Sequence, residues 1–198
     1  MLSIWRRYNG SMSKRDEMLV AAYEIVGREG LEGLHARSVA AVVKVNHAAV
    51  HYYFRTRHDL LVGLLDYMKA RFRVDRAKFL AVADSPLATI EAEFNLAEAY
   101  CKPSSRLLKV WASFFVAAQT DEVLRDSLSE FWGEWSDGVK ESLRAAKKAN
   151  AIREDSAFRD PGFLVSIMIG LGISGQLLGA GFDAGSRIDL MVNGLTIE

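Results

Sequence analysis

Hydrophobic residues recur every three or four positions along most of the chain, which is the spacing of one face of an α-helix. In residues 14–29 these positions are Met18, Leu19, Ala22, Ile25 and Val26. In residues 57–81 they are Leu60, Leu61, Leu64, Leu65, Met68 and Phe72. No segment of useful length shows the alternation of a strand, so the pattern predicts an all-α protein.

Two short helices are predicted between these longer ones, over residues 37–43 and 47–53. The three residues between them form the turn, and the last of the three, Asn46, is a good N-cap for the second helix. Thr56 and Asp59 have the spacing of a capping box that starts the helix 57–81. Two short helices joined by a tight turn form a helix-turn-helix, whose second helix enters the DNA major groove.

Longer helices follow in the remainder of the chain, with Pro86 and Pro161 at helix starts, where proline is tolerated. The predicted ranges are 86–101, 104–118, 121–149 and 158–180, with a short helix near 186–196. The chain is therefore expected to combine a small N-terminal unit with a larger helical body.

The helix predicted over residues 47–53 has one anchoring face and one free face. Val50 and Phe54, four residues apart, can hold it to the preceding helices. Small alanines on the other face allow a close approach and contact with a thymine methyl, while imidazole and phenol groups can bond phosphates or base edges. Arg57, at the next helix N-terminus, is suited to a phosphate. The candidate DNA-contacting residues are Arg37, Asn46, His47, Ala48, Ala49, His51, Tyr52 and Arg57.

Charge is distributed unevenly, although 25 Lys and Arg balance 25 Asp and Glu over the whole chain. Residues 1–57 hold nine basic and five acidic side chains, a net of +4, which leaves −4 for the remainder. All four histidines, at positions 35, 47, 51 and 58, also lie in or just after this basic part. A basic N-terminal part joined to an acidic remainder favours contact with a polyanion through the N-terminal part.

Residues 33–61 resemble the helix-turn-helix signature of the tetracycline-repressor (TetR/AcrR) family of transcriptional regulators. Val39-Ala40 match its apolar–Ala pair, Val45 matches the turn valine, and Val50 and Phe54 match the anchors of its recognition helix. Arg57 stands at the position of a phosphate-binding lysine, and Leu60 at that of the leucine after it. By this resemblance His47, Ala48 and Ala49 occupy base-contacting positions, and His51 and Tyr52 occupy phosphate-contacting ones.

The segment departs from the family pattern at three places. Lys44 replaces the turn glycine, so we expect a left-handed backbone to be disfavoured there. His35-Ala36 replace a threonine pair whose hydroxyls would bind phosphate, and His51 replaces a tyrosine.

The resemblance also implies an organisation and a mode of action. A helix-turn-helix DNA-binding domain would span residues 12–58, and a helical ligand-binding and dimerisation domain residues 59–198. Helices near 121–149 and 158–180 would form the homodimer interface. The protein would be a repressor on a palindromic operator in double-stranded DNA, released by a small apolar or amphipathic effector, with no cofactor.

Aromatic residues recur at helical spacing in the body, at Trp111, Phe114, Phe115, Phe131, Trp132 and Trp135. Such a stripe is compatible with an ordinary core, or with an aromatic ligand cavity that contains a few polar groups. The candidate pocket residues are Trp111, Phe114, Phe115, Gln119, Trp132 and Gln176.

Several other chemistries are disfavoured. His47 and His51 share a helix face but lack an obvious third metal ligand. The GxGxxG pattern at 170–175 has no strand before it, and its region, with Gly172, Gly175 and Gly179 on one side, fits close helix packing better than a nucleotide site. The sequence shows no pairing of a nucleophile with a base that would indicate an enzyme. A helical interaction or structural protein without DNA binding is the alternative.

Residues 161–182 carry no charge, but their six glycines and polar residues argue against a membrane span. The single cysteine, Cys101, and the lack of a signal-peptide-like start favour a cytoplasmic protein.

Overall fold

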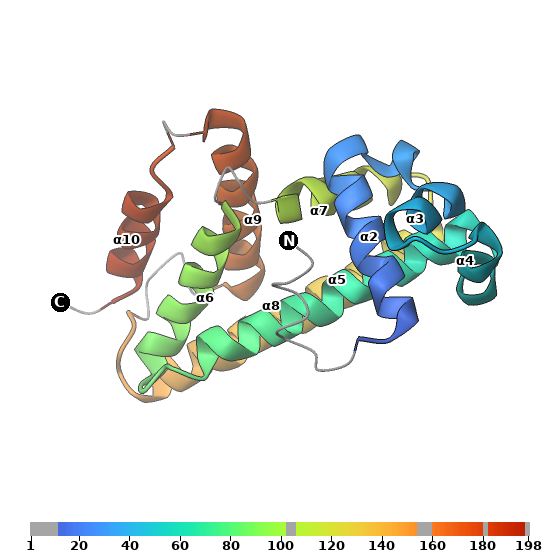
Figure 1. The fold of residues 1–198 in the computed structure, drawn as a ribbon. Helices are drawn as coiled ribbons and strands as arrows, with labels where there is room; N and C mark the ends of the chain where they lie inside the picture. Colours follow the sequence, from blue (N-terminus) through green and yellow to red (C-terminus); the bar gives the residue numbers. More distant parts are fainter. Residues whose placement is uncertain (1–11, 102–105, 154–159, 180–181, 197–198) are drawn as a thin grey trace. The chain divides into compact units, whose positions relative to one another are not determined.

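The computed structural model describes residues 12–101, 106–153, 160–179 and 182–196, and these ranges are almost entirely helical (Figure 1). The helices are α2 (Lys14–Glu29), α3 (Ala36–Val43), α4 (His47–Tyr53), α5 (Arg57–Leu80), α6 (Pro86–Cys101), α7 (Arg106–Ala117), α8 (Glu122–Lys148), α9 (Pro161–Leu178) and α10 (Ala184–Leu195), with a 3₁₀ turn η1 at Leu31–Gly33. The all-α prediction is confirmed.

The helix bounds agree with the sequence pattern to within three residues, apart from the short turn η1, which the pattern did not indicate. Parts of the predicted ranges, such as 104–105 and 158–159, lie outside the described residues. An isolated antiparallel bridge between Ile152 and Thr196 was also not predicted, because a single pair of residues leaves no periodic signal.

The chain divides into two compact units. The first holds residues 1–69 and 109–124, and the second holds residues 70–108 and 125–198. The division reflects contacts within the chain and not function. The predicted boundary between a DNA-binding domain ending at residue 58 and a ligand-binding domain therefore remains a prediction.

The core of the first unit is formed by the apolar faces that the periodicity identified. Members that are at most 3% exposed include Met18, Leu19, Ala22, Ile25, Val26, Leu34, Val39, Val50, Phe54, Leu60 and Leu64. Each large aliphatic or aromatic side chain buried in this way contributes roughly 1.5–3 kcal/mol relative to exposure. This core holds α3 and α4 against α2 and the start of α5.

The second unit has its own core, in which α6 packs on both α9 and α10. A buried carboxylate lies within it: Glu93 is 1% exposed, is paired with the Arg76 guanidinium, and accepts a hydrogen bond from Trp135 Nε1 at 3.3 Å. Gly138 makes room for Arg76, because a β-carbon there would lie 2.5 Å from its guanidinium. The pairing satisfies a charge that would otherwise be costly to bury.

Within the described residues, every helix is either too short or too polar to cross a membrane.

Candidate nucleic-acid interface

The turn between α3 and α4 is closed by a left-handed residue. Lys44 has φ 56° and ψ 49°, so the expectation that lysine would disfavour this conformation here is wrong. A left-handed non-glycine residue costs on the order of 1 kcal/mol. The residue after Lys44 fixes the turn, because Val45 N–H donates to Ala40 O at 3.0 Å. Both helices are also anchored in the core. Packing and hydrogen bonding therefore outweigh the local preference.

Asn46 caps α4, as its position predicts. Its Oδ1 accepts from Ala48 N–H at 3.0 Å, and its main-chain oxygen accepts from Ala49 N–H at 2.9 Å. The side-chain oxygen is thus engaged in fixing the helix start, which leaves the amide nitrogen as the group that could contact DNA.

Helix α4 presents the two faces that its sequence predicts. Val50 is fully buried and Phe54 is 3% exposed, while Tyr52 is 82% exposed. His47, Ala48 and His51 are also exposed, and Ala49 is half-buried. The His47 and His51 rings lie edge to face with centroids 6.1 Å apart. Four of the five predicted outward side chains therefore lie on an open surface.

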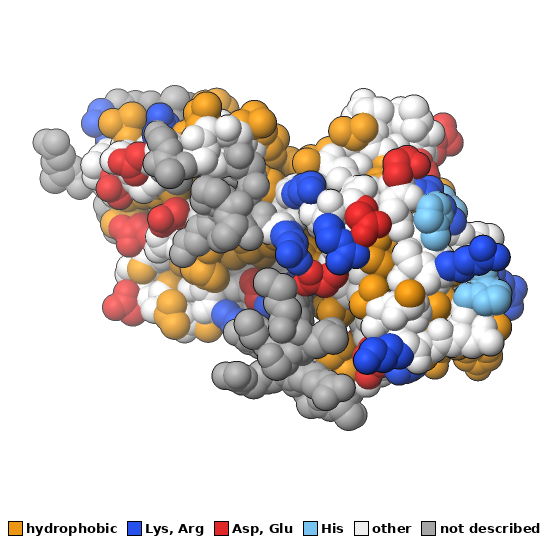
Figure 2. Space-filling model, turned by 45° about the horizontal axis from the view of Figure 1, so that its top comes forward, with side chains coloured by type: hydrophobic (Ala, Val, Ile, Leu, Met, Phe, Trp, Pro, Cys, Tyr) orange, Lys and Arg blue, Asp and Glu red, His pale blue; other side chains and the backbone are white. Residues whose placement is uncertain are grey.

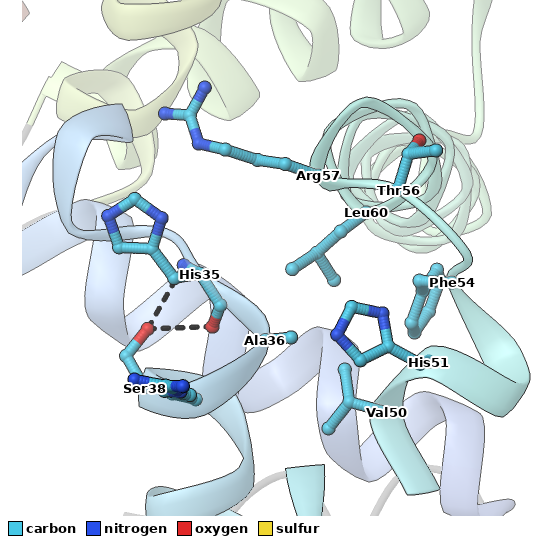
Figure 3. A pocket seen from close by; sticks show the side chains of 10 residues that line it. His35, Ala36, Ser38, Val50, His51, Phe54, Thr56, Arg57 and Leu60 are labelled. Carbon is cyan, nitrogen blue, oxygen red and sulfur yellow. Dashed lines mark hydrogen bonds between the residues drawn. The ribbon is translucent and has the colours of Figure 1, made fainter. Parts of the chain in front are cut away.

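The start of α3 is fixed by a serine that the sequence analysis did not single out. Ser38 Oγ accepts from His35 N–H at 3.1 Å and lies 2.8 Å from His35 O and Gly33 O, as the acceptors of its hydroxyl (Figure 3). Ser38 stands at the third helical position, as the second residue of a capping box does. Histidine is not a usual N-cap residue, so the sequence does not show a recognisable capping box here.

A groove of about 590 Å³ opens between the start of α3, the end of α4 and the start of α5 (Figure 3). Its apolar floor includes Val50, Phe54 and Leu60, and imidazole, guanidinium and hydroxyl groups surround it. The lining residues are His35, Ala36, Arg37, Ser38, Val50, His51, Phe54, Thr56, Arg57 and Leu60. The groove thus brings together three of the predicted DNA-contacting residues, Arg37, His51 and Arg57.

Arg57 has a structural role in this groove that the sequence did not reveal. Its Nε donates to Leu34 O at 3.0 Å, and its Nη2 donates to Leu31 O at 2.5 Å. A guanidinium has five N–H donors, so these bonds leave others for a phosphate. The side chain therefore ties the first turn of α5 to the segment before α3, and its contact with DNA remains a prediction.

The start of α5 has the capping box that the sequence predicts. Thr56 N–H donates to Asp59 Oδ2 and Asp59 N–H donates to Thr56 Oγ1, both at 3.0 Å. One residue further, His58 Nε2 lies 3.0 Å from Asp121 Oδ2, and Asp121 Oδ1 accepts from Leu124 N–H at the start of α8. The first turn of α5 is thereby joined to the corner between α7 and α8 within the first unit.

The surface of the first unit is rich in basic and histidine side chains, which Figure 2 shows on its right, over the part that holds α3 and α4. Arg37, Lys44 and Arg55 are exposed there together with His47 and His51. Among the described residues, three or more His, Cys, Asp or Glu side chains nowhere gather in a group that could hold a metal ion.

The predicted pocket residues fall in both compact units. Trp111 and Phe114 are buried, Phe115 is half-buried, and Gln119 is exposed with its Nε2 donating to Phe115 O at 3.3 Å. These four lie in the first unit, whereas Trp132, half-buried, and the backbone of Gln176 lie in the second. The side chain of Gln176 is outside the described residues. A cavity formed by this set remains a prediction.

The sequence matches no protein-family model. Among curated proteins, it is similar to the HTH-type transcriptional regulator BetI of Rhizobium meliloti, with 22% identity over 147 residues that cover 73% of this chain and 72% of BetI. It is also similar to the HTH-type transcriptional repressor NicS of Pseudomonas putida, with 31% identity over 78 residues, 39% of this chain and 37% of NicS. As expected, both proteins are regulators rather than enzymes.

Solved structures match nearly the whole chain. A TetR transcription regulator from Haloarcula marismortui has a TM-score of 0.79 at 19% identity, over 91% of this chain and 95% of that one. A putative regulator from Saccharomonospora viridis, solved with choline, has a TM-score of 0.78 at 16% identity, over 93% and 98%. A TetR-family member from Streptomyces coelicolor has a TM-score of 0.71 at 23% identity, over 93% and 100%. The resemblance in residues 33–61 is thus confirmed at the level of the whole fold: this chain has the fold of the TetR-family transcriptional regulators.

Proposed function

We propose that this protein is a sequence-specific DNA-binding transcriptional regulator that acts in the cytoplasm as a homodimeric repressor. The observation that carries the proposal is the exposed face of α4, a helix anchored only through its other side. Val50 and Phe54 fix the helix in the core, while His47, Ala48 and Tyr52 stay exposed. A helix-turn-helix contacts base edges through such a face.

The chemistry of that face suits DNA. Ala48 is small enough to let α4 enter the major groove closely, and its methyl group can contact a thymine methyl. His47, His51 and Tyr52 can donate hydrogen bonds to base edges or phosphates, and Arg37, Asn46, Ala49 and Arg57 complete the proposed contact set. Basic residues around the groove add the salt-dependent attraction to the phosphate backbone.

An exposed face of α9 supports the proposed dimer. Its positions Phe163, Ser166, Gly170, Ile173 and Leu177 follow one another at intervals of three and four residues, and all are exposed. The face carries no charge, and α9 has none along its whole length. We propose that it pairs with its copy in a second chain, together with α8, through helices near 121–149 and 158–180.

A two-fold dimer presents two copies of α4, so the operator is an approximate palindrome with half-sites about 34 Å apart or slightly more. A small apolar or amphipathic effector would bind the body and favour a state in which the two helices no longer match successive grooves. The choline complex of the S. viridis neighbour supports a small-molecule effector for this fold. The proposed pocket residues are Trp111, Phe114, Phe115, Gln119, Trp132 and Gln176.

Fluorescence anisotropy tests the proposal. A labelled duplex carrying the DNA upstream of the gene for this protein is titrated at two salt concentrations, with excess unlabelled random duplex present. The expected result is saturable binding that survives the competitor and weakens at higher salt. Binding of neither this duplex nor any fragment in a genome-wide selection would overturn the proposal and favour the helical interaction protein.

Substitution of Tyr52 tests whether the exposed face of α4 is the surface that binds DNA. Tyr52→Ala removes an aromatic ring of α4 that is 82% exposed, and it should cut operator affinity by about tenfold or more, since 1.4 kcal/mol corresponds to tenfold. Val82→Ala, at a similarly exposed position (83%) outside the first unit, is the matched control and should bind as the unaltered protein does. Equal affinities for both variants would contradict the assignment of α4.

A further inference from the structure

Lys44 closes the turn between α3 and α4 in a conformation that suits its side chain poorly. Its φ of 56° and ψ of 49° are left-handed, which brings a β-carbon too close to the following carbonyl oxygen. Glycine has no β-carbon and adopts this conformation readily. The chain therefore carries a lysine at a position where a glycine would relieve the strain.

The other positions with positive φ hold residues that tolerate it. Among the described residues they are Gly30, Gly179 and Asn150, and the φ of Asn150 is 52°. Asparagine is one of the few residue types that visit the left-handed region, because its short polar side chain can form local hydrogen bonds. Lys44 is the exception, and strained residues of this kind cluster at functional sites. Its ammonium group is the part of the residue that needs an explanation.

A role in stability alone explains the lysine poorly. A cation near the end of α3 is favourable because it lies close to the free carbonyl oxygens of the helix. However, Ala41 and Val42 in the last turn of α3 are also exposed, and a cation at either position would give that benefit with ordinary helical backbone. Among the described residues, the ammonium of Lys44 takes part in no ion pair or hydrogen bond.

The surroundings of Lys44 suit an anion from outside the chain. Residues 33–58, which include α3, the turn and α4, contain no Asp or Glu. Lys44 itself is exposed, and it comes two positions before Asn46, the N-cap of α4. A helix-turn-helix brings that end of its second helix to the base edges, so the phosphates that border the groove lie near the turn. A lysine is a point charge on a flexible four-carbon stem, which can reach such a phosphate.

We propose that Lys44 binds a phosphate of the DNA backbone beside the first turn of α4. The inference rests on the proposed function, and it adds a binding residue that does not line the groove between α3, α4 and α5. A phosphate contact fixes how the protein lies on the duplex but carries no sequence information. Lys44 therefore raises the affinity for every duplex by a similar factor, while the exposed face of α4 distinguishes base edges.

The variant Lys44→Gly separates this role from a structural one, because it removes the cation and the strain together. Its melting temperature should rise by about 2–4 °C, as expected for a modest stabilisation of a chain of this length. Its affinity for the labelled upstream duplex should fall by about three- to tenfold, and the slope of log affinity against log salt should become shallower by about one. Lys44→Arg, which keeps the charge, should retain the affinity and the slope of the unaltered protein.

Asn150→Gly is the matched control, because it makes the same backbone change at a left-handed position in the second unit, and it should leave DNA binding unchanged. A random duplex, titrated in parallel, should lose affinity for Lys44→Gly by the same factor as the upstream duplex. Unequal factors would overturn the phosphate contact in favour of a base contact. A lower melting temperature of Lys44→Gly would show that the lysine stabilises the turn, and would also overturn the inference.

The same titrations distinguish the inference from the proposed function. If the unaltered protein binds the upstream duplex and Lys44→Gly binds it with equal affinity and equal salt slope, only the inference fails. If the unaltered protein binds neither the upstream duplex nor any fragment from a genome-wide selection, the proposed function fails and the inference fails with it.

Discussion

Arg57 and Leu34 are joined by a hydrogen bond of 3.0 Å from the guanidinium Nε to the main-chain oxygen, across 23 positions of sequence. The same guanidinium also bonds Leu31 O, so one side chain of α5 fixes the segment that leads into α3. A residue that the family resemblance assigns to phosphate contact thus also positions the helix-turn-helix.

The double role of Arg57 can be separated by substitution. Arg57→Ala should lower the free energy of unfolding by about 1–2 kcal/mol, because it removes hydrogen bonds from a charged donor to two carbonyls. Arg57→Lys keeps the charge but not the planar set of donors, so it should recover part of the DNA affinity and little of the stability. Thermal unfolding and DNA anisotropy on both variants measure the two effects. Unchanged stability of Arg57→Ala would contradict the positioning role.

Two glycines offer a matched test of packing. Gly63 lies on α5 beneath Phe54, and a β-carbon there would lie 2.8 Å from a carbon of its ring. Gly133 lies on α8 with nothing within 4 Å of the same added atom. Gly63→Ala should therefore destabilise the protein by about 1–3 kcal/mol, as overpacking does. Gly133→Ala should stabilise it by up to about 1 kcal/mol, through helix propensity.

Chemical denaturation of the two alanine variants gives these values directly. Because Phe54 also anchors the end of α4, Gly63→Ala should weaken DNA binding in addition to stability. A stabilising Gly63→Ala would show that the Phe54 ring moves aside freely, and that the anchor of α4 is softer than its burial indicates.

The helices and the exposed face of α4 could be predicted from sequence because they depend on local signals. The apolar spacing of α2 and α5, the Asn46 cap and the Thr56–Asp59 box each act within a few residues, and each is present in the structure. The hydrogen bonds of Arg57 were missed because they join residues that are distant in sequence. Arg57 bonds carbonyls 23 and 26 positions away, and no periodicity reports such a pair.

The conformation of Lys44 was missed for a different reason. Local preference argues against a left-handed lysine, but the buried anchors Val39 and Val50 on either side leave the turn little choice. Propensity is a weak effect beside the burial of two such side chains. The pocket that the body aromatics suggest depends on how distant helices pack, and spacing along one helix does not determine that.

The stability of the start of α10 should depend on pH through Asp183. It caps α10, and hydrogen bonds from the Ser186 side chain and backbone hold the pKa of its carboxyl below the ordinary value of 3.8. Because the folded pKa is depressed, the cap contributes its full stability above pH 3.8 and loses it as the pH falls through the lowered value. The start of α10 should therefore fray only in strong acid.

Amide chemical shifts of Ser186, followed by NMR as the pH is lowered, measure this fraying. Asp183→Asn keeps a side-chain oxygen that can cap the helix but does not titrate, so the acid-induced change should disappear in that variant. If the variant loses its Ser186 signals over the same pH range, some other group controls the end of α10.

The exposed face of α9 makes the last prediction, which concerns the proposed dimer. Ile173 is 40% exposed in the middle of this face, and Leu190 on α10 is 73% exposed. If α9 pairs with its copy, Ile173→Asp places two carboxylates in an apolar interface without partners, which is strongly unfavourable. Sedimentation should then show a monomer, while Leu190→Asp stays dimeric although it alters a more exposed apolar side chain.

A monomeric Ile173→Asp should also lose most of its operator affinity, because one helix-turn-helix alone contacts a single half-site. If Leu190→Asp dissociates and Ile173→Asp does not, the two chains meet through α10 instead of α9.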